Sequence, residues 1–113
     1  MKAYKSSEIG KFDKRPGLVG TFAHGKGVTL AHWTFDKDAV LASHSHHHEQ
    51  ITYVLSGKVR FETENDAKVV EPGDFVVFAP NETHGGMALE NSVVLDAFSP
   101  AREDFKADMG WKD

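Results

Sequence analysis

Residues 44–50 read His-Ser-His-His-His-Glu-Gln, and this stretch is the most informative part of the chain for its fold. Residues two apart in a β-strand share a face, so His44 and His46 point to the same side. Gln50 begins the next apolar run and can face them across a hairpin. A distant imidazole, His84, follows a predicted turn, and an antiparallel partner strand can bring it opposite the pair. The stretch therefore predicts paired strands around one metal ion held by these four side chains.

The four predicted ligands are all uncharged. Three imidazoles and an amide leave nearly the whole charge of a divalent ion available to polarise a bound oxygen, which predicts a Lewis-acid site. Zinc, nickel, manganese and iron all suit such ligands. The chain has seven histidines and no cysteine, which excludes thiolate zinc sites, disulfides and a cysteine nucleophile. Any metal chemistry therefore depends on imidazoles.

The other polar residues of the stretch are expected to lie outside the site. His47 has the opposite parity to His46, and His48 falls in the predicted turn, so both are expected at the rim or in solvent. Glu49 is expected to face away from Gln50. The simplest alternative is that all these histidines are solvated surface residues, and the parity of the strands argues against it.

Short apolar runs separated by Gly, Pro, Asn and Asp indicate an all-β protein. The runs are rich in Val, Phe, Ile and Thr, and helical periodicity is nearly absent. Nine short strands indicate a sandwich or barrel whose core spans about residues 17–99 of a single domain, 1–113. Residues 100–111 leave this pattern and are expected to pack down, as one helical turn, on the barrel or on a partner subunit. The predicted strands are Leu18–Ala23, Val28–Phe35, Ala39–His46, Gln50–Leu55, Lys58–Thr63, Lys68–Val70, Phe75–Phe78, Gly86–Leu89 and Ser92–Phe98.

Size and charge exclude several functions. With 113 residues, a net charge of −4, 27% charged and 40% hydrophobic residues, the chain fits one globular domain. The acidic balance and the scattered basic residues disfavour nucleic acid as a partner. Residues 1–10 are polar, and no apolar run reaches the length of a membrane span. We therefore expect no membrane role and a cytoplasmic location.

One carboxylate interrupts the last predicted strand. Asp96 sits within the apolar run from Val93 to Phe98, and a buried carboxylate near an arginine or a metal is a mark of a functional site. By parity Asp96 and Phe98 share a face, so a pocket wall with one carboxylate and one ring is expected. Arg102 can then fold back over the mouth of the pocket. Spacing alone equally allows Asp96 to pair with Arg102 and pin the tail.

Turn and ligand residues follow one another in a definite order between residues 38 and 98. They are His44-Ser45-His46-His47-His48-Glu49-Gln50, Tyr53, Gly57, Gly73-Asp74, Pro80 and His84-Gly85. This order resembles the two sequence motifs of the cupins. The resemblance implies a double-stranded β-helix, or jelly-roll, barrel with a metal at its open end. Gln50 replaces the commoner glutamate of that family, and Glu82 stands where many members have glycine.

Residues 96–102 read Asp-Ala-Phe-Ser-Pro-Ala-Arg, and this ending resembles the small cupins of the KdgF type, the pectin degradation proteins. Those proteins convert 4,5-unsaturated uronates, released by pectin or alginate lyases, from the cyclic sugar to a linear keto acid. The resemblance implies an isomerase that opens the sugar ring, with Asp96 as the acid/base, Phe98 as the ring contact and Arg102 as the arginine that binds the sugar acid. It also implies a homodimer, which apolar tail residues such as Trp111 favour.

Two other functions suit the same residues. A ferrous iron dioxygenase also uses a histidine-rich site with open positions, and it differs by consuming oxygen. A non-catalytic cupin that binds a sugar acid would release its ligand unaltered, and it would tolerate the loss of Asp96. Fold analogy does not separate these possibilities from the uronate enzyme.

Overall fold

Alternating burial explains why this sequence forms sheets. In strand β3 (Thr29–Phe35), Ala31 and Trp33 are buried, whereas the residues between them are exposed. Strand β10 (Ser92–Ser99) repeats this period of two along its whole length. β-Branched and aromatic side chains fit such a half-buried pleated surface. Each strand therefore presents one face to a common core and the other to the outside.

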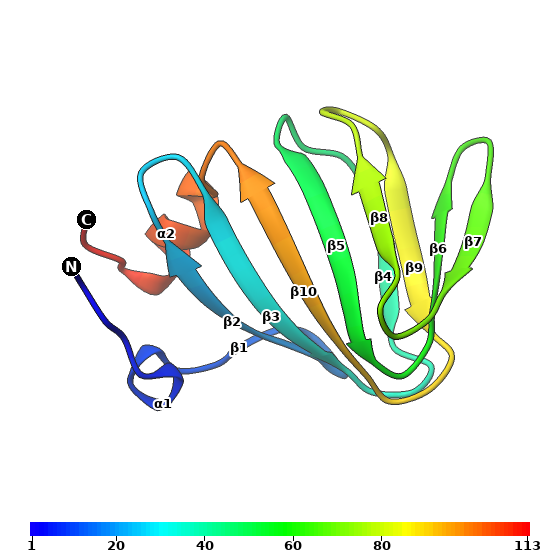
Figure 1. Ribbon diagram of the computed structural model, residues 1–113, viewed down its shortest axis with the longest axis horizontal. Coiled ribbons are helices and arrows are strands. Elements are labelled where there is room, and N and C mark those ends of the chain that lie inside the picture. Colours follow the sequence, from blue (N-terminus) through cyan, green and yellow to red (C-terminus); the bar gives the residue numbers. More distant parts are fainter.

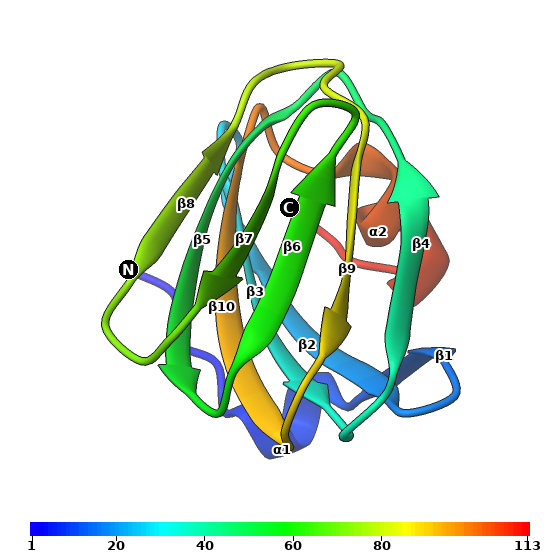
Figure 2. The same ribbon diagram turned by 90° about the vertical axis from the view of Figure 1, so that its right-hand side faces the viewer.

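The computed structural model describes residues 1–113 as two antiparallel sheets with short helices near both ends of the chain (Figure 1). Figure 2 shows the smaller sheet in front of the larger one, and this arrangement confirms the predicted all-β jelly-roll barrel. The helices are α1 (Ser6–Ile9) and α2 (Glu103–Met109). In order across each sheet, the strands are β1 (Phe12–Arg15), β2 (Leu18–His24), β3, β10, β5 (Glu49–Ser56) and β8 (Phe75–Phe78), and then β4 (Val40–His44), β9 (His84–Ala88), β6 (Val59–Thr63) and β7 (Ala67–Val70).

The core lies between the two sheets. Fourteen buried apolar residues form one cluster, to which the larger sheet contributes Phe22 and Trp33 and the smaller sheet contributes Val59 and Phe61. The rings of Phe22 and Trp33 meet edge to face, 5.1 Å apart, as aromatic pairs prefer. Burial of this apolar surface is the main stabilising contribution to the fold. Polar side chains inside the barrel are exceptions that need partners.

The turn between β5 and β6 requires a glycine. Gly57 has a φ of +84°, and a Cβ atom at this position would lie 2.6 Å from the Cα atom of Ser92. The backbone N–H of Lys58 donates a hydrogen bond to the Ser92 hydroxyl, 3.0 Å away, so the two chain segments pass close together here. A side chain at position 57 would therefore clash as well as strain the backbone.

The structure adds one strand to the nine predicted. Strand β1 lies at the edge of the six-stranded sheet and pairs with β2. It has one half-buried residue followed by three exposed ones, so it lacks the alternation that indicates a strand. Two predicted boundaries move by two residues, since β4 ends at His44 rather than at His46 and β9 begins at His84 rather than at Gly86, and the other boundaries move by one residue or none.

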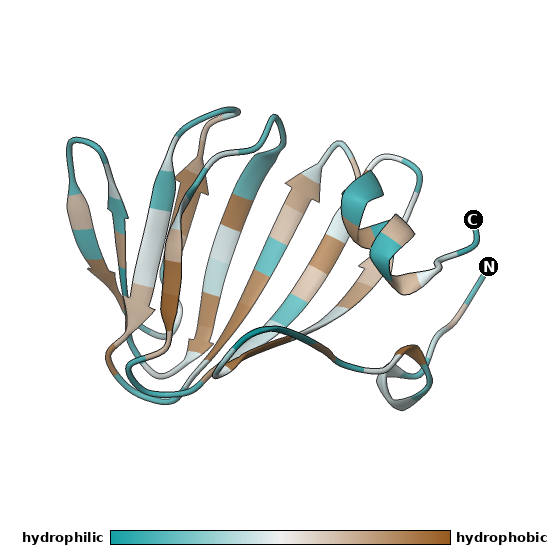
Figure 3. Cartoon of the chain, turned by 180° about the vertical axis from the view of Figure 1, so that it is seen from behind, coloured by the Kyte–Doolittle hydropathy of each residue, from teal (hydrophilic) through white to brown (hydrophobic).

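The C-terminal tail packs on its own barrel. Helix α2 lies beside the ends of β2 and β3 (Figures 1 and 3), and its Phe105 ring stacks on Phe22 with 4.8 Å between centroids. Trp111 lies 4.8 Å from the ring of Tyr4 and 5.1 Å from that of His24. Trp111 therefore packs against residues of its own chain. Neither helix has the length and apolar character that crossing a bilayer requires.

Candidate metal centre and cavity

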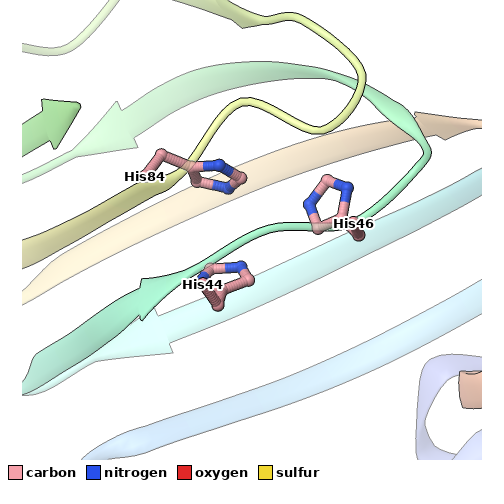
Figure 4. A group of neighbouring side chains, drawn as sticks. All are labelled: His44, His46 and His84. Carbon is pink, nitrogen blue, oxygen red and sulfur yellow. The ribbon is translucent and has the colours of Figure 1, made fainter. Parts of the chain in front are cut away.

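Two strands of the smaller sheet bring the predicted histidines together. The pairing of β4 with β9 places His44 directly opposite His84. His46 follows two residues after the end of β4 and keeps the same side, as strand parity predicts. Figure 4 shows the three imidazoles clustered, and one nitrogen of each ring lies within 4.8 Å of one nitrogen of the others. The predicted histidine triad is therefore assembled.

The orientation of each ring follows from a hydrogen bond to the backbone. In each ring Nδ1 lies at hydrogen-bonding distance from a carbonyl oxygen, and because a carbonyl only accepts, Nδ1 must carry the hydrogen. In a neutral ring this leaves the lone pair on Nε2, the nitrogen not used by the backbone. The pairs are His44 with Ala42 at 2.9 Å, His46 with His48 at 3.0 Å and His84 with Glu82 at 2.8 Å.

Burial favours the neutral form of two of the rings, those of His46 and His84. Burial lowers the pKa of His84 and of His46, because an imidazolium loses hydration inside the barrel. The Nε2 atom of His84 is buried and has no hydrogen-bond partner within the protein. A buried lone pair without a partner is costly, and a cation would satisfy it together with the lone pairs of the other two rings. The triad therefore fits a divalent metal ion.

Gln50 supplies a fourth group from the opposite sheet. It lies on β5, is 4% exposed, and places its side-chain oxygen 3.0 Å from Nε2 of His46. Because that nitrogen bears no hydrogen in the neutral tautomer, two lone pairs face each other. A cation near both atoms turns this repulsion into attraction. The predicted set of His44, His46, Gln50 and His84 thus bridges both sheets.

His48 corrects the sequence-based prediction. It was expected at the rim, but only 4% of it is exposed, and its ring packs 5.4 Å from that of His46 and 6.3 Å from that of Phe98. The inward parity that begins at His44 continues through the turn to Gln50, which draws His48 inside. His47 is exposed as expected.

Asp96 lies inside the barrel on the same face of β10 as Phe98. It is 8% exposed and accepts a hydrogen bond from the Thr52 hydroxyl at 2.6 Å. Burial raises the pKa of Asp96 to about 6, and hydrogen bonding by Thr52, Gln50 and Trp33 works in the opposite direction. A carboxyl group with this pKa is ionised at neutral pH and can still exchange a proton there, which suits a general acid/base.

Arg102 is buried, but its ion pair is with Asp104. Its Nε and Nη2 atoms donate to the two carboxylate oxygens of Asp104 at 3.0 and 2.8 Å. These bonds hold the pKa of Asp104 down at about 2. The guanidinium lies 3.8 Å from the centre of the Phe105 ring and 4.7 Å from that of Phe98. The alternative that Arg102 pairs with Asp96 to pin the tail is not what the structure shows. Nη1 takes no part in this pair.

One cavity is lined by Asp96, Phe98 and Arg102 together with two of the candidate metal ligands, His44 and Gln50. Its volume is about 150 Å³, a size that accommodates roughly one six-membered ring. Arg102 is joined in its lining by Lys14 and Arg15 from β1, which sequence reasoning missed because β1 gave no strand pattern. Three cations beside one carboxylate favour a small anion as the ligand. The residues lining the cavity are Lys14, Arg15, Leu18, Trp33, Phe35, Leu41, His44, Gln50, Asp96, Phe98, Arg102 and Phe105.

Comparison with known proteins matches most of the barrel. A family model described as Cupin domain matches residues 31–96. The pectin degradation protein KdgF of Dickeya dadantii is 40% identical over 73 residues, which cover 63% of this chain and 66% of that protein. The chain thus spans just under two thirds of the length of this relative.

Two solved structures are similar over nearly the whole chain. KdgF from a Halomonas species superposes with a TM-score of 0.85 at 34% identity, covering 92% of this chain and 99% of that one. An RmlC-like cupin from Shewanella frigidimarina gives a TM-score of 0.84 at 29% identity, covering 90% of this chain and 93% of that one. The similarity extends beyond residues 31–96 to the flanking segments that complete the cavity.

Proposed function

This chain belongs to the cupin family and resembles its KdgF type, and from that starting point we propose that it is a metal-dependent enzyme that acts on 4,5-unsaturated uronates. It would open the cyclic sugar and tautomerise the product to a linear keto acid. The name of the Dickeya relative, a pectin degradation protein, supports a sugar acid from pectin, and alginate would supply related substrates. The finer identity of the reaction rests on the cavity.

One observation carries the proposal, namely that Asp96 lines the same small cavity as His44 and Gln50, and that His44 belongs to the histidine triad. A divalent ion held by His44, His46, Gln50 and His84 would supply a Lewis acid that stabilises negative charge on substrate oxygens. Zinc, nickel, manganese and iron are all compatible with these ligands. Because the ligands are uncharged, they leave the charge of the ion available to the substrate.

Asp96 is proposed to move the proton. The substrate is a hemiacetal whose ring oxygen is attached to the C5 end of a C4–C5 double bond. Asp96 takes the proton of the anomeric hydroxyl as the C1–oxygen ring bond breaks, which leaves an aldehyde at C1 and an enolate at C5. The same carboxyl group then returns the proton to C4, and the C5 oxygen becomes a ketone. One proton moves from oxygen to carbon, and no redox partner is needed.

Arg102 and Phe98 are proposed to hold the substrate. The Nη1 side of Arg102 suits a carboxylate, while its pairing with Asp104 and its stacking on Phe105 keep the guanidinium in place. The Phe98 ring borders the cavity and offers a flat apolar surface to the sugar. The substrate carboxylate would thus be oriented while the anomeric carbon faces Asp96.

The direct test follows the loss of ultraviolet absorbance as the conjugated double bond disappears. Wild-type protein should consume unsaturated galacturonate, whereas Asp96→Asn and chelator-treated protein should each be slower by about 10²- to 10⁴-fold. Glu49→Gln is the matched control, because Glu49 is an exposed neighbour of Gln50 on the other face of β5. Equal decay in all samples, or none with wild type, would reject the proposal.

The histidine triad also suits the alternative of a ferrous iron dioxygenase. An oxygen electrode distinguishes the two enzymes, because ring opening consumes no oxygen. A binding protein without catalysis would return the sugar acid unaltered. Oxygen consumption and the recovery of unaltered sugar acid can both be measured in the same reaction mixture.

We further propose a cytoplasmic homodimer. Trp111, on which the sequence-based prediction drew, packs within the chain. Exposed apolar side chains instead gather on the outer face of β5 and β8, where Ile51, Leu55, Phe75 and Val77 are each at least 43% exposed. Light scattering of the purified protein checks the expected mass of two chains.

A further inference from the structure

Thr52 stands between the candidate metal centre and the candidate acid/base. It lies on β5 directly opposite Asp96 of β10, and none of it is exposed. Its hydroxyl oxygen is 2.9 Å from the side-chain nitrogen of Gln50 and 2.6 Å from Oδ1 of Asp96. Thr52 does not line the cavity, so it reaches a ligand only through these two neighbours.

The direction of these hydrogen bonds is determined by chemistry. An ionised carboxylate only accepts, so the single hydroxyl hydrogen of Thr52 is committed to Asp96. The 2.6 Å separation is typical of a hydroxyl that donates to a carboxylate. The Thr52 oxygen can then only accept from Gln50, which requires the amide nitrogen to face Thr52. The amide oxygen is thereby turned towards His46.

The same logic gives a reason for glutamine at position 50. A glutamate has no N–H to donate, so Thr52 could turn its hydrogen to that residue instead of to Asp96. Glutamine removes this choice because its nitrogen donates and its oxygen accepts. The Gln50 side chain and the Asp96 carboxylate are therefore oriented by one shared hydroxyl group.

We propose that Thr52 is a positioning residue that orients the Gln50 oxygen towards the metal site and the Asp96 carboxylate towards the cavity. Its effect on turnover rests on the proposed function, whereas its effect on metal binding does not. Loss of an outer hydrogen-bond partner of a metal site lowers affinity or activity by about 10- to 100-fold. Misplacement of a reacting group by about 1 Å has an effect of similar size, about 100-fold.

The test compares Thr52→Val, which keeps the shape and removes the hydroxyl, with Thr52→Ser, which keeps the hydroxyl. Thr34→Val is the matched control, because Thr34 is exposed on the outer face of β3. We expect Thr52→Val to lower kcat on unsaturated galacturonate by about 10- to 100-fold with little change in KM. It should also weaken Co²⁺ binding by about 10-fold, and Thr52→Ser should restore most of both.

Two results would overturn this role: Thr52→Val that matches wild type in kcat and in Co²⁺ affinity, or Thr52→Ser that is as impaired as Thr52→Val. If wild type leaves the uronate unchanged, the proposed function is wrong and the Co²⁺ affinities alone decide the role of Thr52. Gln50→Glu gives a second route if Thr52→Val does not fold. The Gln50→Glu variant, which keeps Thr52, should have a lower kcat than wild type. An unchanged kcat would argue against the proposal that the Thr52 hydroxyl orients both Gln50 and Asp96.

Discussion

One wall of the site is built by β4, β5 and β9 and presents uncharged imidazole and amide groups, of which His44 and Gln50 line the cavity. The other wall, built by β1 and the segment leading into α2, presents cations to the cavity. The first wall lies wholly within the residues that match the cupin family, 31–96, and the second lies wholly outside them. Under the proposed function, the shared barrel would supply the metal ligands, and the flanking segments would adapt the cavity to its substrate.

The two walls also differ in how their side chains are held. The imidazoles are fixed by hydrogen bonds to carbonyl oxygens of nearby residues in the chain. Arg102 is fixed by Asp104 and by two aromatic rings. Lys14 has only one such restraint, a position 5.0 Å from the centre of the Phe105 ring. Substitutions in the first wall should therefore abolish chemistry, and those in the second should weaken binding in graded steps.

The largest effect is expected in the uncharged wall. His84→Ala removes one predicted ligand, and the loss of several kcal/mol of charge stabilisation corresponds to a decrease in kcat of about 10³-fold or more. His32→Ala is the control, because His32 is exposed on the outer face of β3. Turnover should be measured in excess metal. Activity within tenfold of wild type would show that this wall does not carry the chemistry.

Arg102→Lys should have the next largest effect. Lysine keeps the charge but loses the planar fork, so contacts to both Asp104 and a substrate carboxylate are weakened. A hydrogen bond between charged groups contributes about 1.5–3 kcal/mol, which corresponds to an increase in KM of about 10- to 150-fold. Arg60→Lys, at an exposed position of β6, should leave KM unchanged. A normal KM for Arg102→Lys would remove Arg102 from substrate binding.

A smaller effect is expected for the cations of β1. Lys14→Ala and Arg15→Ala should each raise KM by about two- to fivefold with kcat unchanged, because partly exposed charges contribute about 0.2–1 kcal/mol. The increase should shrink at high salt. Lys68→Ala, on the distant strand β7, is the control. A change in kcat instead of KM would contradict the assignment of substrate binding to the cationic wall and of the chemistry to the uncharged wall.

The smallest effect concerns the pH dependence of stability at Asp104. Its pKa is about 2 in the folded chain and 3.8 for an ordinary aspartate, so its ionised form stabilises the fold. This stabilisation is complete above about pH 4 and is lost as the pH falls towards 2. The midpoint temperature of thermal unfolding should therefore be higher for wild type than for Asp104→Asn at pH 6. The difference between the two midpoints should be smaller at pH 3. A difference in midpoint temperature that does not change with pH would argue against the ion pair between Arg102 and Asp104.

Strand parity was sufficient to predict that His44 and His46 point to the same side, whereas the placement of His84 also required an assumed antiparallel partner strand. A two-residue period determines which side chains share a face, so His44 and His46 were placed correctly without knowledge of the sheet order. The same rule failed at His48, which was assigned to a turn although the inward alternation continued through it. Asp96 was recognisable because a carboxylate interrupts an apolar strand.

The remaining parts of the site carried no local signal. Strand β1 reads Phe-Asp-Lys-Arg, and an exposed edge strand of this kind lacks the apolar alternation that indicates a strand. Thr52 is an ordinary strand residue by composition, and only the pairing of β5 with β10 places it against Asp96. The tail has several acidic residues, and only the structure shows that Asp104 is the one that pairs with Arg102.

Titration of chelator-treated protein with Co²⁺, followed by visible absorption, tests whether the chain holds a metal ion at the histidine triad. Wild type should bind one ion per chain. His46→Ala should bind more weakly by over about 100-fold, beyond the loss caused by removing an outer partner. Absence of a bound ion in wild type, or equal affinity in His46→Ala, would contradict the metal centre on which the proposed chemistry depends.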